Sequence, residues 1–460
     1  MRYISLLLGA AACLTACAAT PVLIQSDRFA PEPYVKLTHP EWTRDAVIYE
    51  INVRQYSDAG TFDAVREDLP RLTELGVDVL WLMPIHPIGE VERKGPLGSY
   101  YSVKDYYGVN PEFGTKEDFE RFVDAAHDQG FKVILDWVAN HTAWDNELAI
   151  NHPDWYEKDW KGDFRPTPWW DWSDIIDLDF SKPGVRRYMS DAMTYWVDEM
   201  DVDGFRADVA GYVPLDFWEG LRSRLNAIKP VFMLGEWQSR DLHARAFDAT
   251  YAWDWKEAMQ NIAQGKADTG ALYSYYSANE SAWPMDAMRM TYTDNHDQNS
   301  WDGLPQEIYG DAYEAAIVLQ FTSEGIPMIY SGQECANSNR LEFFEKDPIV
   351  WNCDDAINAL MTDLVQLKTD NPVLHNGAWG ARATKVENSN PQNVFSFIRQ
   401  SEAGNAVLVT ANLSDEAQSF AYTDGLPLGD YDAFRTNVPV TIDASTMTLP
   451  AWGWTVHVRK

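Results

Sequence analysis

The sequence predicts an α/β fold in which parallel strands close into a barrel, followed by an all-β module. Three observations support this prediction. Short apolar runs alternate with amphipathic stretches from residue 45 to about 370, one connection is too long for an ordinary loop, and the pattern changes beyond about residue 375. Eight runs have the length of buried strands, which favours a closed barrel over a doubly wound open sheet, the competing interpretation. The predicted strands are residues 46–53, 77–85, 132–138, 203–209, 231–237, 247–253, 288–294 and 326–332.

Amphipathic segments between these runs predict the helices that would cover the barrel. Glycine follows two of them, at Gly76 and Gly130, where a left-handed residue commonly ends a helix. The helix-like segments are residues 61–75, 116–129, 183–199 and 355–368. We therefore assign residues 41–141 and 183–374 to the barrel.

Residues 142–182 separate the third predicted strand from the next helix and contain the polar, tryptophan-rich stretch DWYEKDWKGDFRPTPWWDW. A structureless connection of this length is uncommon, so we expect a small inserted domain or a lid. Its clustered tryptophans have two interpretations: apolar groups that let a small domain fold, or ring faces that bind sugar beside a cleft. These residues are Trp160, Trp169, Trp170 and Trp172. Residues 375–460 contain short strand-like runs, such as AVLVTANLS, and are expected to form the all-β module.

The N-terminus has the features of a targeting segment. Residues 1–17, MRYISLLLGAAACLTAC, contain one positive charge, a short apolar stretch and small residues before Cys17, which predicts a secretory signal. The ending Leu-Thr-Ala-Cys resembles a bacterial lipobox, after which Cys17 would become the lipidated first residue; an ordinary signal cut nearby is the alternative. Residues 18–40 are expected to be a tether. No later stretch approaches about 18 consecutive apolar residues. We therefore expect the protein to be exported and to contact a membrane only through a lipid anchor. The resemblance to lipoproteins implies that this membrane is the outer membrane of a Gram-negative cell.

Composition restricts the partners of this chain. Its 460 residues include 37 Lys and Arg against 70 Asp and Glu, a net charge of −33, which argues against nucleic acid or an anionic membrane as a ligand. The 20 Trp and 22 Tyr residues favour carbohydrate, whose rings bind flat aromatic faces. The spacing of Cys335 and Cys353 fits no metal site; whether they pair is left open. The sequence does not predict the oligomeric state.

Polar and charged side chains stand at or near the ends of four predicted strands. They are Asp136 with Asn140 and His141, Arg206 with Asp208, Glu236, and His296 with Asp297. Catalytic groups of α/β barrels lie at the carboxyl ends of several strands, so a shared site is expected. A buried structural ion pair is the alternative for Arg206 and Asp208 alone, but it does not explain the other strand ends. Three carboxylates and two histidines, without a CxxC, HExxH or glycine-rich phosphate motif, indicate glycosyl transfer through paired carboxylates.

Asp208 and Glu236 have opposed surroundings in the sequence. Arg206 would keep the Asp208 carboxyl ionised, as a nucleophile requires. Glu236 is flanked by Leu234, Gly235 and Trp237, and this apolar neighbourhood would raise its pKa, as a general acid requires.

These motifs resemble the α-amylase family, glycoside hydrolase family 13. LDWVANH (135–141), GFRADVA (204–210), LGEW (234–237) and YTDNHD (292–297) are similar to its four ordered regions, and IDLDF (176–180) to a fifth. The resemblance covers residues 45–460. It implies a (β/α)8 TIM barrel, a domain B inserted after strand three, a C-terminal β-sandwich and retaining cleavage of α-glucosidic bonds.

The resemblance also implies roles for individual residues. Asp208 matches the nucleophile, Glu236 the acid/base, Asp297 the third carboxylate, Arg206 the residue that positions the nucleophile, His141 and His296 the hydroxyl-binding histidines, Tyr101 the aromatic that stacks on the sugar, and Asp136 the strand-three aspartate beneath the site. Asn140 matches a ligand of the family's structural calcium, as does Asp177 less directly. Many α-amylases carry Lys-His where this chain has Gly211-Tyr212, which puts the contacts on the leaving-group side, and calcium, in question.

The expected function is hydrolysis of α-glucosidic bonds, most of all α-1,4 bonds of starch and maltooligosaccharides, with no cofactor needed for the chemistry. A transglycosylase, an α-glucosidase or a cyclodextrinase on the same barrel is the first alternative. A non-catalytic carbohydrate-binding protein is the second, and it would be expected to have lost Asp208 or Glu236. Chain length, linkage preference and endo or exo action do not follow from the sequence.

Overall fold

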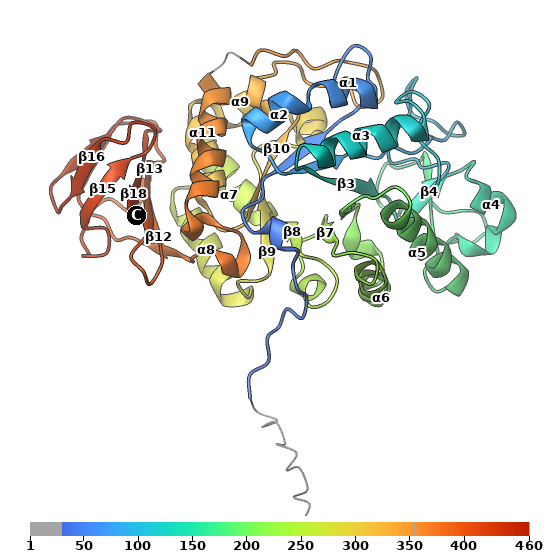
Figure 1. Cartoon of the computed structure of the whole chain (residues 1–460), viewed down its shortest axis with the longest axis horizontal. Helices are drawn as coiled ribbons and strands as arrows, with labels where there is room; N and C mark the ends of the chain where they lie inside the picture. Colours follow the sequence, from blue (N-terminus) through green and yellow to red (C-terminus); the bar gives the residue numbers. More distant parts are fainter. Residues whose placement is uncertain (1–29, 354–355, 460) are drawn as a thin grey trace, which may run out of the picture. The chain divides into compact units, whose positions relative to one another are not determined.

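Eight parallel strands form a closed barrel, in the order β1-β10-β9-β8-β7-β6-β3-β2. The prediction of a barrel is therefore confirmed, and the open-sheet alternative is wrong. The strands are β1 (Ile48–Ile51), β2 (Val79–Leu82), β3 (Lys132–Trp137), β6 (Gly204–Ala207), β7 (Phe232–Gly235), β8 (Ala249–Tyr251), β9 (Met288–Thr291) and β10 (Ile326–Tyr330). Helices surround the strands in this computed structural model (Figure 1).

The structure describes residues 30–353 and 356–459. A compact unit begins at Val35, and the few described residues before it belong to a separate unit. The predicted signal, the lipobox with Cys17 and the first part of the tether lie outside the described residues. Within the described ranges, no helix combines the length and apolar character needed to cross a bilayer.

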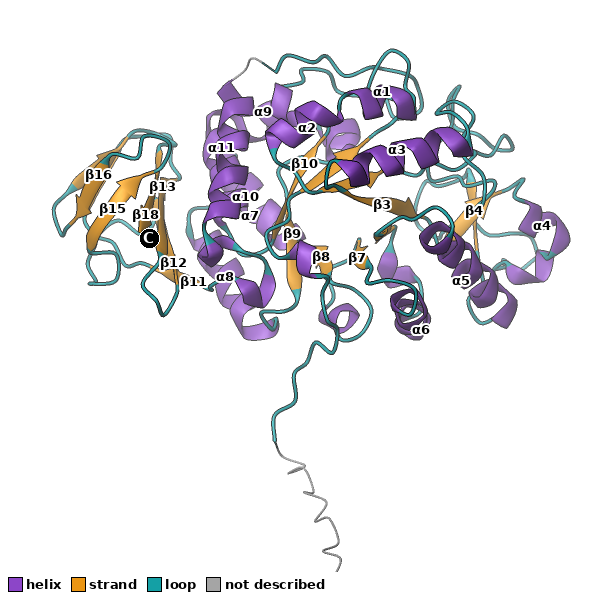
Figure 2. Cartoon of the chain, viewed as in Figure 1, coloured by secondary structure: helices purple, strands orange, loops and turns teal. Residues whose placement is uncertain are grey.

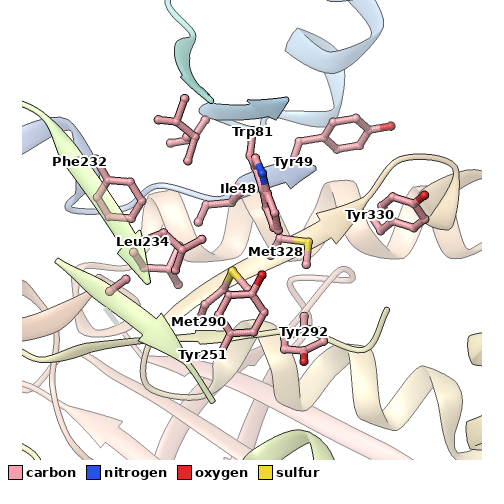
Figure 3. Packing of buried hydrophobic residues seen from close by; sticks show 14 of the residues in the cluster. Ile48, Tyr49, Trp81, Phe232, Leu234, Tyr251, Met290, Tyr292, Met328 and Tyr330 are labelled. Carbon is pink, nitrogen blue, oxygen red and sulfur yellow. The ribbon is translucent and has the colours of Figure 1, made fainter. Parts of the chain in front are cut away.

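The barrel strands are buried along their whole length because helices cover them outside and side chains fill them inside. Trp81 and Met328, from β2 and β10, lie next to each other among the buried side chains (Figure 3). This packed interior is typical of such barrels and leaves only the strand ends for a site.

Each of the four predicted helical segments is helical, and the barrel has further helices between the later strands. The barrel helices are α1 (Phe62–Glu67), α2 (Leu69–Leu75), α3 (Lys116–Asp128), α5 (Pro183–Asp198), α6 (Leu215–Asn226), α7 (Trp253–Ala263), α8 (Gly270–Ala282), α9 (Pro305–Tyr309), α10 (Tyr313–Thr322) and α11 (Ala356–Asp370). The single helix predicted over 61–75 is two helices, because Pro70 lacks the N–H that a continuous helix needs and instead occupies the first turn of α2. Gly76 ends α2 in the left-handed conformation, as predicted.

The long connection after β3 contains its own small sheet. β4 (His141–Ala143) pairs with β5 (Ile175–Asp177) in antiparallel register, and α4 (Glu147–Asn151) lies between them in the chain. The pairing sets His141 directly opposite Asp177. Part of this insertion is therefore regular structure that supports one rim of the barrel.

The C-terminal region contains strands in place of helices (Figure 2). One sheet has the order β11-β12-β13-β18-β15-β16 and a second pairs β14 with β17. The strands are β11 (Ala383–Lys385), β12 (Val394–Gln400), β13 (Ala406–Asn412), β14 (Gln418–Phe420), β15 (Gly429–Ala433), β16 (Pro439–Ile442), β17 (Met447–Leu449) and β18 (Trp454–Arg459). The all-β prediction is confirmed.

Both faces of the larger C-terminal sheet are covered at β12 and β13, whose alternate residues point to opposite sides. Val394 and Ile398 of β12 join a cluster that includes Phe420 of the smaller sheet. Phe395 of β12 faces the other way and stacks on Tyr276 of α8, with ring centroids 5.7 Å apart. This explains why β12 and β13 are apolar runs without the alternation of a half-exposed sheet.

Cys335 and Cys353, whose pairing the sequence left open, form a disulfide.

Candidate active site

The carboxyl ends of the barrel strands bring the predicted polar residues together. Asp136 lies opposite Arg206 in the register of β3 and β6. Asp208 follows β6 directly, and its N–H donates to the Trp137 carbonyl at 3.0 Å. Glu236 follows β7, and its N–H donates to the Ala207 carbonyl at 3.0 Å. Barrel register thus places residues from distant parts of the sequence around one point.

These residues face a cleft of about 530 Å³. Its floor includes the three carboxylates predicted to be catalytic. Its walls come from the insertion and from two loops after β9 and β10. The lining includes Tyr101, His141, Asp208, Glu236, His296 and Asp297 on the floor, and Trp170, Trp172, Trp301, Phe343 and Phe344 on the walls.

Arg206 is the cation at the centre of this floor, and it is fully buried. Its Nη1 lies 2.8 Å from Asp136 Oδ1 and 3.0 Å from Asp208 Oδ1. Its Nη2 lies 3.0 Å from Glu236 Oε2, an ion contact outside hydrogen-bond geometry. One guanidinium therefore touches three carboxylates, which is more than the Arg206–Asp208 pair expected from the sequence.

Burial decides the protonation of the two catalytic candidates. It raises the pKa of Asp208 to about 6, although Arg206 opposes the shift. It raises the pKa of Glu236 to about 7, with Arg206 again opposing and Asp208 adding to the increase. Arg206 favours the ionised form of Asp208, as expected from the sequence, but burial raises the pKa of this carboxyl further than Arg206 lowers it. The order of the two pKa values, with Glu236 the weaker acid, agrees with the roles inferred from the sequence.

A strained turn links these two carboxyls. Val209 has a φ of 36°, in the left-handed region that a β-branched residue rarely adopts. This conformation directs the Val209 N–H to Glu236 Oε2 at 2.8 Å. Such strain persists where the surroundings over-determine the backbone, and here it fixes the orientation of Glu236.

The residues predicted to hold a sugar ring lie on the other side of the floor. The Tyr101 hydroxyl lies 2.7 Å from His296 Nε2 and donates to Asp136 Oδ2 at 3.1 Å. The Tyr101 and His296 rings are nearly parallel, with centroids 5.5 Å apart. Asp297 lies 3.5 Å from His296 Nε2 with its side chain half exposed to the cleft. This leaves Asp297 free to accept sugar hydroxyls.

The two histidines, treated alike in the sequence, differ in charge. Burial lowers the pKa of His141 to about 4, so this ring is neutral near pH 7. Burial also disfavours the charged form of His296, but Asp297 and Glu50 outweigh it and raise the pKa to about 9. His296 is therefore an imidazolium at neutral pH.

Sequence reasoning missed two residues of this floor. Glu50 of β1 lies with Oε1 2.5 Å from His296 Nδ1, and Trp81 of β2 donates from Nε1 to Asp136 Oδ2 at 3.2 Å. A signal existed for Glu50, since it is the one charge inside the apolar run AVIYEINV. No such signal existed for Trp81, because a tryptophan in a buried strand is a common core residue.

The residues predicted as calcium ligands meet, but they satisfy each other. Asn140 Nδ2 donates to Asp177 Oδ1 at 3.1 Å, and the Thr167 hydroxyl donates to the same oxygen at 2.5 Å. Calcium takes about six to eight oxygen ligands, usually with several carboxylates. Among the described residues, no group of three His, Cys, Asp or Glu side chains could hold a metal ion. Asn140 and Asp177 together supply one carboxylate, of which Oδ1 is occupied by protein donors, so these two residues alone fall short of a calcium donor set.

The four tryptophans of the insertion divide into two pairs. Trp160 and Trp169 are 89% and 102% exposed, so the interpretation that all four pack the insertion is wrong for them. Trp170 and Trp172 stack with ring centroids 5.2 Å apart and line the cleft. The sugar-platform interpretation stays a prediction for this second pair, whose rings line the cleft as it requires.

The Gly211-Tyr212 departure has a structural reason. Trp170 Nε1 donates to the Tyr212 hydroxyl at 3.0 Å, so the insertion and the loop after β6 are joined across the cleft rim. A Cβ at residue 211 would lie 2.2 Å from the Trp237 ring, so only glycine allows that ring to pack beside Glu236. Tyr212 also contacts Trp237 edge-on at 5.2 Å.

Comparisons with known proteins agree with this geometry. A family model described as the alpha amylase catalytic domain matches residues 43–425. The alpha-amylase MalA of Haloarcula japonica is 32% identical over 436 residues, covering 90% of this chain and 63% of that protein. This chain therefore spans less than two thirds of that relative's length.

Two solved structures resemble the chain over nearly its full length. An alpha-amylase from Lactobacillus plantarum is 31% identical with a TM-score of 0.80, and the match covers 92% of this chain and 100% of that one. The noncanonic maltogenic alpha-amylase AmyB from Thermotoga neapolitana is 29% identical with a TM-score of 0.82, covering 90% of this chain and 99% of that one. With the family model matched across the barrel, the chain belongs to the α-amylase family.

Proposed function

We propose that this protein is a retaining glycoside hydrolase that cleaves α-glucosidic bonds by double displacement. The observation that carries the proposal is the pair Asp208 and Glu236, buried at neighbouring strand ends around Arg206, with Glu236 the weaker acid. A retaining mechanism needs one ionised carboxylate to attack and one carboxylic acid to protonate the leaving group.

In this mechanism the Glu236 carboxyl gives its proton to the glycosidic oxygen while Asp208 Oδ attacks the anomeric carbon. The bond to the leaving group breaks, and a glycosyl ester forms on Asp208. The Glu236 carboxylate then takes a proton from water, whose oxygen attacks the same carbon and releases Asp208. Two inversions return the original anomeric configuration. Asp297 and His296 would hold hydroxyls of the ring, and Tyr101 would stack on it.

The substrate class follows from the family and from the cleft. The relatives bear the names alpha-amylase, maltogenic alpha-amylase and, at 23% identity, cyclomaltodextrinase of Thermoanaerobacter pseudethanolicus. We therefore favour α-1,4-linked glucans, with starch and maltooligosaccharides as the first substrates to test. A cyclodextrinase or α-glucosidase acting on short or cyclic substrates stays the alternative, and the departure at Gly211-Tyr212, where Tyr212 bonds to Trp170 across the rim, leaves it open. No cofactor enters the chemistry.

The test uses conservative variants of both carboxyls. Asp208→Asn removes the nucleophile and Glu236→Gln removes the acid/base, each with little change in shape, and each is expected to lower kcat by several orders of magnitude at unchanged melting temperature. Proton NMR of the first products from an α-linked substrate is expected to show α-anomers. Activity within tenfold of wild type in either variant, or β-anomers as first products, would contradict the assignment.

We also propose that the chain is exported and anchored through Cys17, for which the support is the lipobox-like LTAC alone. The natural protein is expected to sediment with membranes, and Cys17→Ser to release it or block processing. Cys13→Ser is the matched control. Wild-type protein found entirely in the soluble fraction would exclude the anchor and leave the proposed enzyme activity unaffected.

A further inference from the structure

Glu50 contacts His296 in the active-site floor, and no role in the proposed reaction has been given to it. It is in the middle of β1, where its neighbours in register are Trp81 of β2 and Tyr330 of β10. Its side chain is fully buried. Oε1 lies 2.5 Å from His296 Nδ1, whereas Oε2 has no hydrogen-bond partner in the described part of the chain.

A purely structural carboxylate would be expected to have both oxygens satisfied, because leaving a buried acceptor unpaired destabilises the fold. Glu50 instead makes a single short contact, to one atom of one active-site residue. An unsatisfied buried acceptor calls for an explanation, and for Glu50 the contact with an active-site residue offers one.

His296 is oriented by contacts on both ring nitrogens. Nδ1 faces Glu50, and Nε2 faces the Tyr101 hydroxyl at 2.7 Å and Asp297 Oδ2 at 3.5 Å. The ring edge also meets Trp81 at a centroid distance of 6.1 Å. A proton held on Nδ1 by Glu50 therefore fixes which face of the ring is presented to the cleft.

Other charges act on this pair from the surrounding strands. Asp297 and Asp136 favour the charged form of His296, and Arg206 opposes it. On the side of Glu50, burial raises the pKa of Tyr251, Tyr292 and Tyr330 well above the ordinary value, so these three groups are neutral near pH 7. Burial also raises the pKa of Asp294 well above its ordinary value, which disfavours a charge on that carboxyl. Glu50 is thus the carboxylate in direct contact with His296 on the side away from the cleft.

We propose that Glu50 is a positioning residue that acts through His296, holding its ring oriented and doubly protonated so that Nε2–H faces the sugar and Tyr101. As an imidazolium, His296 donates from both nitrogens and lies beside Asp297 with a positive charge. As a neutral ring, it would have to keep its one proton on either Nδ1 or Nε2, and the donor facing the cleft would compete with the contact to Glu50. The kinetic part of this inference rests on the proposed function; the state of the ring does not.

The test replaces the charge but keeps the shape, with Glu50→Gln. The primary measurement is the ¹⁵N NMR titration of His296, assigned with His296→Gln. Wild-type His296 is expected to stay protonated beyond pH 8, with its midpoint near 9, and Glu50→Gln to move that midpoint down by at least one pH unit. An unchanged midpoint would overturn the proposal, even if the protein proved to have no hydrolase activity.

The kinetic measurement separates positioning from structure. Glu50→Gln is expected to lower kcat by roughly 10–100-fold, as for carboxylates that orient metal-bound histidines, with a smaller change in KM. In a His296→Gln background, Glu50→Gln is expected to change kcat less than twofold. Equal losses in both backgrounds would show that Glu50 acts only through packing and would overturn the inference.

Asp78→Asn is the matched control. Like Glu50, Asp78 carries a carboxyl group. It directly precedes β2, at the opposite end of the barrel from the active site, and accepts from the Val47 N–H at 2.9 Å. It is expected to leave the His296 titration and kcat unchanged. Should Glu50→Gln fail to fold, Glu50→Asp keeps the charge and withdraws it by one methylene. A smaller downward shift of the His296 midpoint is then expected, and no shift would again overturn the proposal.

Discussion

Removing the Arg206 guanidinium is expected to move the whole pH profile of the enzyme upward. Arg206→Gln deletes the only cation within 3.0 Å of Asp208 Oδ1 and Glu236 Oε2 among the described residues. Two unit charges about 4 Å apart interact by about 4 kcal/mol at an effective dielectric constant of about 20. At about 1.36 kcal/mol per pKa unit, each carboxyl would gain up to about three units.

The sign of this change is specific. Arg206 favours the ionised form of both carboxyls, so its loss raises both pKa values, from about 6 for Asp208 and about 7 for Glu236. At pH 6 the ionised nucleophile would fall from about half to roughly one part in a thousand. The value of kcat/KM at pH 6 is therefore expected to fall by up to three orders of magnitude and to recover as the pH rises.

The assay is the initial rate on a chromogenic maltooligosaccharide from pH 4 to pH 10, with the melting temperature measured in parallel. Arg222→Gln is the matched control, because Arg222 is equally buried and pairs with Asp248 at 2.6 Å and 3.1 Å, away from the cleft. Breaking a buried pair costs about 3–5 kcal/mol in either variant. A uniform loss in Arg206→Gln at every pH, with the profile unmoved, would refute the electrostatic reasoning.

Three further outcomes are expected. The wild-type kcat/KM should follow a narrow bell with limbs near pH 6 and pH 7, from Asp208 and Glu236, and a flat profile from pH 4 to pH 9 would contradict these assignments. Trp172→Ala should lose about 1–3 kcal/mol of transition-state binding on long maltooligosaccharides at unchanged melting temperature, by analogy with aromatic stacking on bases. The control Trp169→Ala removes a fully exposed tryptophan and should lose none. Equal effects of the two variants would contradict the role of Trp172 as a sugar platform. Exhaustive chelation should leave the melting temperature unchanged, because Asp177 Oδ1 already accepts from Asn140 and Thr167; a fall that calcium restores would contradict this prediction.

The barrel could be predicted because its strands carry their signal locally. A fully buried parallel strand is a short apolar run, and eight such runs are present. Arg206 and Asp208 stood out for the same reason, as charges inside one of those runs. Their neighbours in space, Asp136 and Glu236, followed from the rule that strand ends meet at one face of a barrel.

What the sequence could not provide was the competition between burial and charge. Whether Asp208 keeps a low pKa depends on how deeply it is buried and on how many carboxyls share Arg206, and both depend on tertiary structure. The same holds for Glu50, since its partner His296 is far away in the chain and joins it only when the barrel closes. The break at Asp68 was visible in Pro70, but the amphipathic pattern continued across it.

Because of the Cys335–Cys353 disulfide, the redox state of the compartment in which the chain folds affects the wall of the substrate cleft. It closes a loop with a sequence separation of 18, and that loop carries Phe343 and Phe344, two walls of the cleft. Phe343 lies nearly parallel to Tyr101, with ring centroids 6.3 Å apart. Closing a loop of this size is worth about 3 kcal/mol in the chain-entropy account. A recombinant host that folds the chain in a reducing cytosol would therefore yield a protein whose catalytic carboxylates are in place but whose loop 335–353, with Phe343 and Phe344, is less constrained. Oxidised and reduced preparations of the same polypeptide would then differ in their affinity for the sugar chain more than in kcat.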